Sequence, residues 1–295
     1  MYDARNSTGD RANLVFGVAT LVVVSLAFAL AWFAGGAVSG DGRGAGAAPI
    51  SSFSPDDGSA LAAAFTSPEE ARLLSAMGRL DPAVLGDLEA RIAATGARED
   101  HIEILRETTG RLLIDNAEHL AGITGSDINA MLDDAARTLG QVRASNNELC
   151  MGATYASFEN MSPRQAQREA DRLMAKVGLG PEDAHQMSVS WQAKFVDMTA
   201  RAKQNPVRHG KLTPQDEAAF EGLVMGFMTD PTFVRMAMSN NQADALASVN
   251  FCDMGLKVIR EIRKLPDGTK ARAWASVFDM PEVRQALRDA KSLGF

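Results

Sequence analysis

The most strongly apolar stretch of the chain lies near its N-terminus. No charged residue occurs between Arg11 and Asp41, and the densest apolar part, Leu14 to Ala34, is 21 residues long. At about 1.5 Å per residue, a helix of this length measures roughly 30 Å, which matches the hydrocarbon core of a bilayer. The pattern therefore predicts a single transmembrane helix over 14–34. The alternative is a cleaved signal peptide, whose apolar region is usually shorter, about 7 to 15 residues.

The charges that flank this segment predict its orientation. Arg5 and Arg11 precede it, whereas only Arg43 follows it closely. Because positive residues favour the cytoplasmic side, we expect residues 1–13 to be a short cytoplasmic tail and everything after the span to lie outside the cytoplasm. The abundance of Ala and Gly, and the absence of Lys before Lys176, suggest a bacterial source. We therefore expect a single-pass protein of the bacterial inner membrane with a periplasmic C-terminal part.

After the span, the spacing of apolar positions changes twice. Residues 35–66 are rich in Gly, Ala, Ser and Pro without periodic apolar positions, which predicts a flexible linker. From residue 67 onward, apolar residues recur at helical spacing and no alternating strand pattern stands out. Helix starts are marked by a capping residue followed by Pro, as in Ser67-Pro68 and Thr213-Pro214. We therefore expect an all-α fold, with helices near 68–79, 82–95, 98–121, 127–158, 163–177, 181–204, 214–228, 231–239, 241–265, 269–278 and 281–292.

One of these helices carries a heptad-like stripe, in which apolar positions follow each other at spacings of three and four. Such a stripe requires a second helix, and 98–121 is the nearest candidate because the turn at 122–126 can reverse the chain. The pattern predicts an antiparallel helical hairpin with a coiled-coil-like seam. Residues placed on this seam include Ile128, Leu132, Leu139, Val142, Asn146 and Leu149.

Aromatic residues divide the helical part in two. Residues 67–147 contain no Phe, Tyr or Trp and carry an excess of acidic residues, whereas 148–295 hold most of the large rings. Large rings build thick cores. We therefore expect an acidic helical hairpin region over 67–147, followed by a compact helical domain over 148–295.

The net charge bears on the partners of the chain, and the two cysteines bear on its compartment. The net charge of −7 gives no reason to expect nucleic acid or an anionic membrane surface as a partner. The only two cysteines, Cys150 and Cys252, are expected to form a disulfide in an oxidising compartment. Two separate buried thiols are the alternative, which a cytoplasmic location favours.

No catalytic motif stands out along the chain, and the four histidines are scattered. The chain contains no phosphate-binding glycine motif, no metalloprotease helix signature and no CxxC pair. The many methionines suit helical cores better than a soft-metal site, so we expect neither a cofactor nor a metal.

The leading hypothesis is a non-enzymatic interaction or scaffold protein. It is anchored in the lipid bilayer through Leu14 to Ala34 and holds another membrane or periplasmic protein. Small residues at four-residue spacing near the end of the span also allow a homo-oligomer. The alternatives are a hydrolase whose acidic residues converge only in the fold, and a helical carrier of a ligand or lipid.

Overall fold

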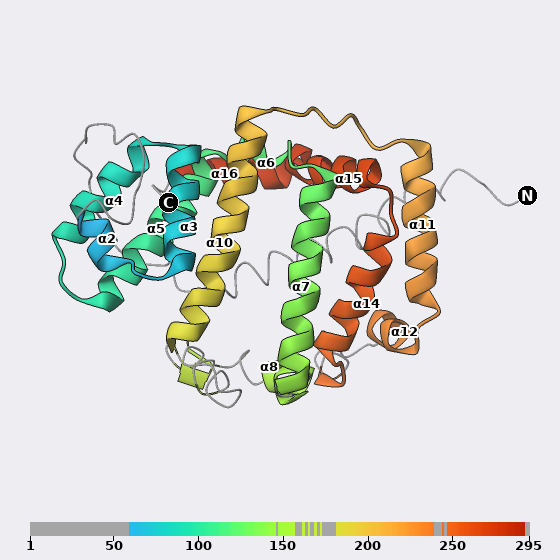
Figure 1. Ribbon diagram of the computed structural model, residues 1–295. Coiled ribbons are helices and arrows are strands. Elements are labelled where there is room, and N and C mark those ends of the chain that lie inside the picture. The colour runs from blue at the N-terminus through green and yellow to red at the C-terminus, as the bar shows by residue number, and fades with distance from the viewer. Residues whose placement is uncertain are drawn as a thin grey trace, which may run out of the picture. The chain divides into compact units, whose positions relative to one another are not determined.

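The computed structural model describes residues 59–145, 147–156, 181–238 and 247–292, together with residues 161, 162, 165, 168, 169, 172 and 244. This part of the chain is all-α (Figure 1). Its one extended feature is an isolated bridge between Met151 and Asn250. The helices are α2 (Ala60–Ala64), α3 (Pro68–Leu80), α4 (Ala83–Ala93), α5 (Arg98–Asp115), α6 (Ala117–Leu120), α7 (Gly125–Ser145), the 3-10 helix η1 (Asn147–Cys150), α8 (Gly152–Ala156), α10 (Pro181–Gln204), α11 (Pro214–Met228), α12 (Pro231–Met238), α14 (Phe251–Arg263), α15 (Asp267–Asp279) and α16 (Pro281–Ser292).

The described residues belong to two units, each built from segments that are distant in sequence. The α7–α14 unit comprises Gly125–Pro181 and Lys211–Ala273. The α3–α10 unit comprises 59–124, Glu182–Gly210 and 274–292. The helices of each unit are brought together by long-range packing that local sequence does not show. The predicted boundary near residue 148 stays a prediction.

The α3–α10 unit has a dense aliphatic core between α2, α3, α4, α5 and α10. Helix α3 contributes Leu73, Leu74, Met77 and Leu80, which lie on one face at spacings of one, three and three residues. A capping box with Pro at the first position starts α3, as the sequence predicts. At the other end of the unit, the indole of Trp274 donates to Leu120 O at 2.7 Å.

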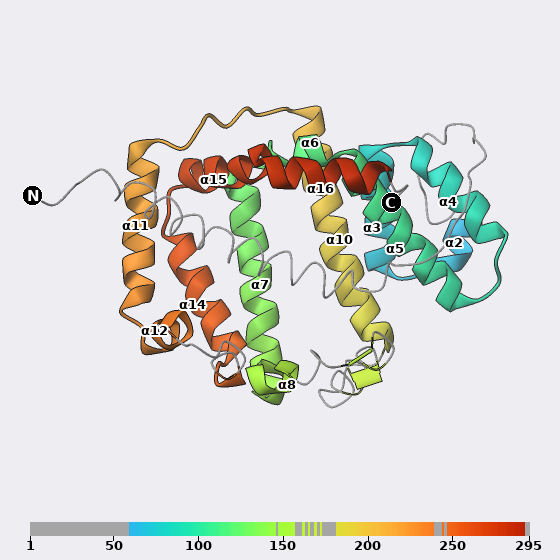
Figure 2. The same cartoon turned by 180° about the vertical axis from the view of Figure 1, so that it is seen from behind.

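The α7–α14 unit is organised around two antiparallel helices, which Figures 1 and 2 show side by side. Ion pairs link α7 to both ends of α14, Asp133 to Arg263 at 2.9 Å and Arg143 to Asp253 at 3.1 Å. Between these pairs, Gly255 allows close approach, because a Cβ there would lie 2.8 Å from Leu139 Cδ1. A smaller cluster, in which Leu223 and Phe227 pack with Leu265, joins α11 to the C-terminal end of α14.

The long helix expected over 127–158 is interrupted after Ser145. The chain continues through η1 and the bridge at Met151, and α8 begins at Gly152. Gly152 N donates to Val249 O at 2.7 Å, and this hydrogen bond connects the start of α8 to the residues just before α14. The interruption follows from these contacts with residues about 100 positions away, which the local helical pattern does not contain.

Two further sequence predictions concern the N-terminal part of the chain. The predicted tail 1–13, the span Leu14 to Ala34 and residues 35–58 of the linker lie outside the described residues. Among the helices that are described, none combines the length and apolarity needed to cross a bilayer. Helix α2 lies within the predicted linker range, where Leu61 and Phe65 are buried; a five-residue helix is too short to show periodicity in the sequence.

Candidate functional site

Glu70 is the centre of a charged cluster in the α3–α10 unit. As the third residue of α3 it completes the capping box, accepting from Ser67 N at 3.1 Å through Oε2. Its side chain is fully buried. The second oxygen, Oε1, accepts from Arg98 Nη2 at 2.6 Å and lies 2.8 Å from His185 Nε2. The cluster therefore joins the N-terminal ends of α3 and α5 to the first turns of α10.

These contacts keep the carboxylate of Glu70 ionised. Burial alone raises the pKa of Glu70, but the hydrogen bonds from His185 and Arg98 outweigh it, and the pKa falls from 4.5 to about 2. Arg98 is itself held in place, because Nη1 donates to Ala64 O at 2.8 Å and Nη2 lies 3.2 Å from Glu182 Oε1. A buried negative charge is thus matched by a fixed positive one.

The same cluster is also the candidate cation site of the described residues. One ligand atom each from Glu70, Glu182 and His185 lies within 4.8 Å of the others, a donor set that suits a divalent metal. However, the Arg98 guanidinium already donates to both carboxylates, and arginine stays charged at any ordinary pH. A metal ion would have to displace this group, so the residues fit an ion-pair junction better than a metal centre.

In the α7–α14 unit, Asp216 is a second buried carboxylate that caps a helix and binds a distant arginine. It is the third residue of α11 and closes a capping box with Thr213. Arg272 of α15 binds it with two nitrogens, Nε at 2.7 Å and Nη2 at 2.8 Å, and Thr269 Oγ1 donates to it at 2.5 Å. The Arg272 hydrogen bonds hold the pKa of Asp216 well below its usual range. Each unit therefore locks the start of one helix to a distant arginine.

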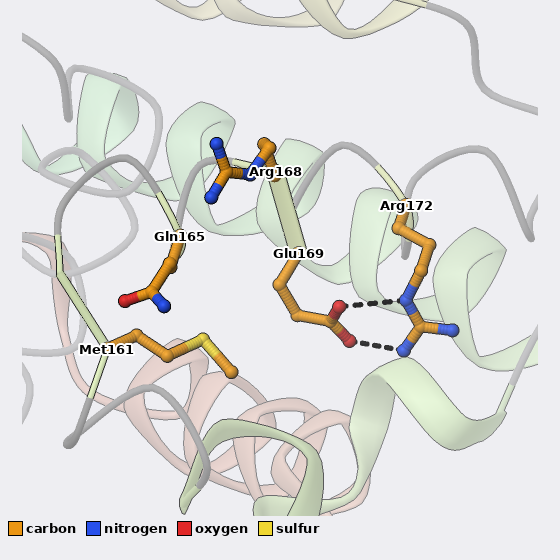
Figure 3. A pocket seen from close by; sticks show the side chains of 5 residues that line it. All are labelled: Met161, Gln165, Arg168, Glu169 and Arg172. Carbon is orange, nitrogen blue, oxygen red and sulfur yellow. Dashed lines mark hydrogen bonds and ion pairs between the residues drawn. The ribbon is translucent and has the colours of Figure 1, made fainter.

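Figure 3 shows an open pocket in the α7–α14 unit, lined by Met161, Gln165, Arg168, Glu169 and Arg172. The carboxylate of Glu169 faces the guanidinium of Arg172 in a double ion pair, and Arg168 points away from that pair. Gln165 Oε1 accepts from Ser162 N at 2.9 Å and from Ser162 Oγ at 2.8 Å. The polar groups of Gln165, Glu169 and Arg172 are therefore used in local contacts within one stretch of chain.

A different kind of feature lies on α11. At 100° per residue, its core-facing half carries Leu223, Val224 and Phe227, all buried. Along the centre of the opposite half lies Met225, whose side chain is 65% exposed, while Met228 is 43% exposed. Added Cβ atoms at Gly222 and Gly226 would meet nothing within 4 Å. Helix α11 thus carries exposed apolar residues outside its buried side.

Comparison with known proteins does not add a function to these features. No protein-family model, no curated protein and no solved structure matches the chain.

The structure brings the two cysteines together. Cys150 and Cys252 lie with Cα atoms 5.1 Å apart, within the range of a disulfide, and both are buried. They connect η1 to the first turn of α14, beside the bridge at Met151. The geometry thus permits the predicted bond across 102 positions.

The structure describes five of the six predicted seam residues. Within its unit, α7 packs along α14, whereas the expected partner 98–121 belongs to the other unit. Of the seam residues, Ile128, Leu132 and Leu149 are buried, Leu139 and Val142 are partly buried, and Asn146 lies outside the described residues. The pairing of 127–158 with 98–121 stays a prediction, because a stripe on one helix does not identify its partner.

The sequence marked both capping boxes but not the ion pairs around them. Arg98 lies 28 positions from Glu70, and Arg272 lies 56 positions from Asp216. No local spacing connects such pairs. By contrast, the exposed apolar side of α11 had a local signal, because the run from Ala218 to Met228 is apolar all round apart from Glu221.

Proposed function

We propose that the chain is a non-enzymatic interaction or scaffold protein of the bacterial inner membrane. In this proposal Leu14 to Ala34 anchors it in the bilayer and the helical units lie in the periplasm. There they bind another membrane or periplasmic protein. A homo-oligomer is the second candidate, which the small residues at four-residue spacing near the end of the span allow.

The uncovered apolar side of α11 carries this proposal. Met225 and Met228 are two of the three large hydrophobic side chains that are exposed among the described residues. Methionine adapts its shape to a partner, and an apolar helix side left open to water favours association with another surface. A binding protein needs such a surface, whereas a hydrolase does not.

The charged clusters support the same choice. Glu70 and Asp216 are the acidic residues buried among those described, and both have lowered pKa values because arginines bind them. A general acid needs a raised pKa, and a carboxylate engaged by a guanidinium is a poor base. The hydrolase alternative therefore has little support from these residues, and the described part of the chain contains nothing that favours the carrier alternative.

The approach of Cys150 and Cys252 supports the location. A disulfide forms and persists in an oxidising compartment such as the periplasm, and two buried cysteines at bonding distance suit that environment. This agrees with the orientation that the flanking arginines favour.

Purification of the tagged full-length chain tests the proposal. The chain is expressed at its native abundance, extracted from native membranes in a mild detergent and analysed for bound proteins. We expect a second protein in a fixed ratio to the chain. Recovery of the chain alone, with its helical content intact, contradicts the proposal.

A further inference from the structure

The uncovered side of α11 is acidic along one edge and carries small residues along the other. Viewed down the axis at 100° per residue, Met225 lies in the middle, with Glu217 and Glu221 along one edge. Ala218, Gly222 and Gly226 lie along the other edge. We call these six residues the outer face of α11; all six are exposed.

The small-residue edge allows close approach of a second helix. Gly222 and Gly226 stand one turn apart, and the space above each is open to at least 4 Å. Two helices come closest where one of them has small residues, because the side chains of the other then reach its backbone. The side chains of the incoming helix would pack there beside Met225.

The acidic edge determines the charge of what binds. The side chains of Glu217 and Glu221 make no ion pair or hydrogen bond within the described part of the chain, and α11 contains no Lys or Arg. Its third acid, Asp216, faces inward and is already neutralised by Arg272. The outer face is therefore both apolar and negatively charged.

This charge pattern favours one occupant over the others. An anionic lipid surface would be repelled by Glu217 and Glu221. A second copy of the same face would bring no positive charge to meet them. A helix with Lys or Arg beside an apolar stripe satisfies both edges, since its cations meet the acids while its apolar side chains cover Met225 and the glycines.

We propose that the outer face of α11 binds an amphipathic, positively charged helix of the partner protein. This inference rests on the proposed function, because it specifies the surface and the chemistry by which the partner is held. It does not depend on the orientation of the chain in the membrane.

The test uses two synthetic helices as probes. They share one leucine stripe and differ only in the residues beside it, which are lysine in one and glutamate in the other. Binding of each fluorescently labelled helix to the full-length chain in detergent is measured by anisotropy at low and moderate salt. We expect the lysine helix to bind at least tenfold more tightly than the glutamate helix.

Two variants locate the binding. Gly222→Gln places a side chain in the open notch without meeting another residue, so the helix should fold while the lysine helix binds at least tenfold more weakly. Glu221→Lys should reduce the preference for the lysine helix or reverse it. The matched control is Gly140→Gln on α7, another helical glycine with open space above it, which should leave binding unchanged.

Several results would overturn the inference. Equal binding to wild type and Gly222→Gln would place the lysine helix elsewhere on the chain, and equal binding of the two probes would remove the charge argument. Dimerisation of the chain that Gly222→Gln abolishes would identify a second copy as the occupant, and Gly222-dependent binding to anionic vesicles would identify lipid. If a partner co-purifies equally well with Gly222→Gln, only the docking face fails and the proposed function stands.

Discussion

Replacing Glu70 with glutamine removes the buried negative charge at the start of α3 and keeps the size of the side chain. The amide can still accept one hydrogen bond, but Arg98 loses its principal charge partner, and the amide nitrogen faces donors that formerly met a carboxylate oxygen. We therefore expect the α3–α10 unit to become less stable near neutral pH.

The size of this effect follows from the pKa of Glu70. In the folded chain the pKa is about 2, against 4.5 for the unperturbed group. This difference corresponds to about 3 kcal/mol of stability at neutral pH. Because the folded pKa is the lower one, the contribution is present above pH 4.5 and is lost as the pH falls from 4.5 toward 2. The glutamine variant lacks this contribution at every pH, so the gap between variant and wild type should narrow below pH 4.5.

Tryptophan fluorescence provides a local assay. Trp191 and Trp274 both belong to the unit that contains Glu70, so in a Trp32→Phe background their emission reports its unfolding. Urea unfolding of the full-length chain in detergent should be followed at pH 7, 5 and 3. The matched control is Glu69→Gln, which removes an exposed ion pair to Arg72 and should change stability by less than about 1 kcal/mol. Equal stability of Glu70→Gln and wild type at pH 7, or a gap that does not change with pH, would refute the reasoning.

Three further predictions concern stability. Arg98→Met leaves the Glu70 carboxylate buried without its cation and should cost about 3 to 5 kcal/mol in the same urea assay at pH 7; a cost below that of a surface substitution would contradict it. Reduction of the bond between Cys150 and Cys252 should destabilise the α7–α14 unit by about 4 to 5 kcal/mol. The measurement is urea unfolding followed by circular dichroism with and without reductant. Free thiols in the chain under oxidising conditions would show that no bond forms. Gly125→Ala places a methyl group against the backbone of α15 and should lower the stability by about 1 to 3 kcal/mol in thermal unfolding. Gly140→Ala on the same helix has open space and should raise the stability by roughly 0.5 to 1 kcal/mol. Similar effects of the two variants would show that α15 does not approach Gly125 closely.

Helix boundaries were predicted well where local chemistry defines them. The capping boxes at Ser67 and Thr213 mark the starts of α3 and α11, and α16 occupies the predicted range. A cap is formed by residues within four positions of each other, so the sequence contains everything needed to recognise it. Where a helix begins because of contacts with distant residues, this information is missing.

The unpredicted parts depend on such distant contacts. Helix α2 is held by the burial of Leu61 and Phe65, and the break near residue 146 accompanies the corner fastened by Cys150 and Cys252. The pairing of α7 with α14 joins residues more than 100 positions apart. Alternative pairings of helical stripes are nearly equivalent in sequence, and the packed volume of the whole unit selects among them.

The same distinction holds for the charged clusters and for the outer face of α11. Glu70 and Asp216 could be recognised as capping residues, but their burial against Arg98 and Arg272 depends on the fold. The outer face of α11 needed the structure to show which side stays uncovered, although the apolar run itself was visible in the sequence.

The central claim, that a membrane span holds the helical units outside the cytoplasm, is tested most directly by labelling single cysteines. Ala45→Cys lies after the predicted span and Thr8→Cys before it. Cells with a permeabilised outer membrane are treated with a maleimide that does not cross the inner membrane, and the wild-type chain serves as the control for Cys150 and Cys252. We expect Ala45→Cys to be labelled, with Thr8→Cys and wild type labelled only after detergent lysis or reduction. Labelling of Thr8→Cys but not Ala45→Cys in unlysed cells would contradict the claim, and so would recovery of the chain in the soluble fraction.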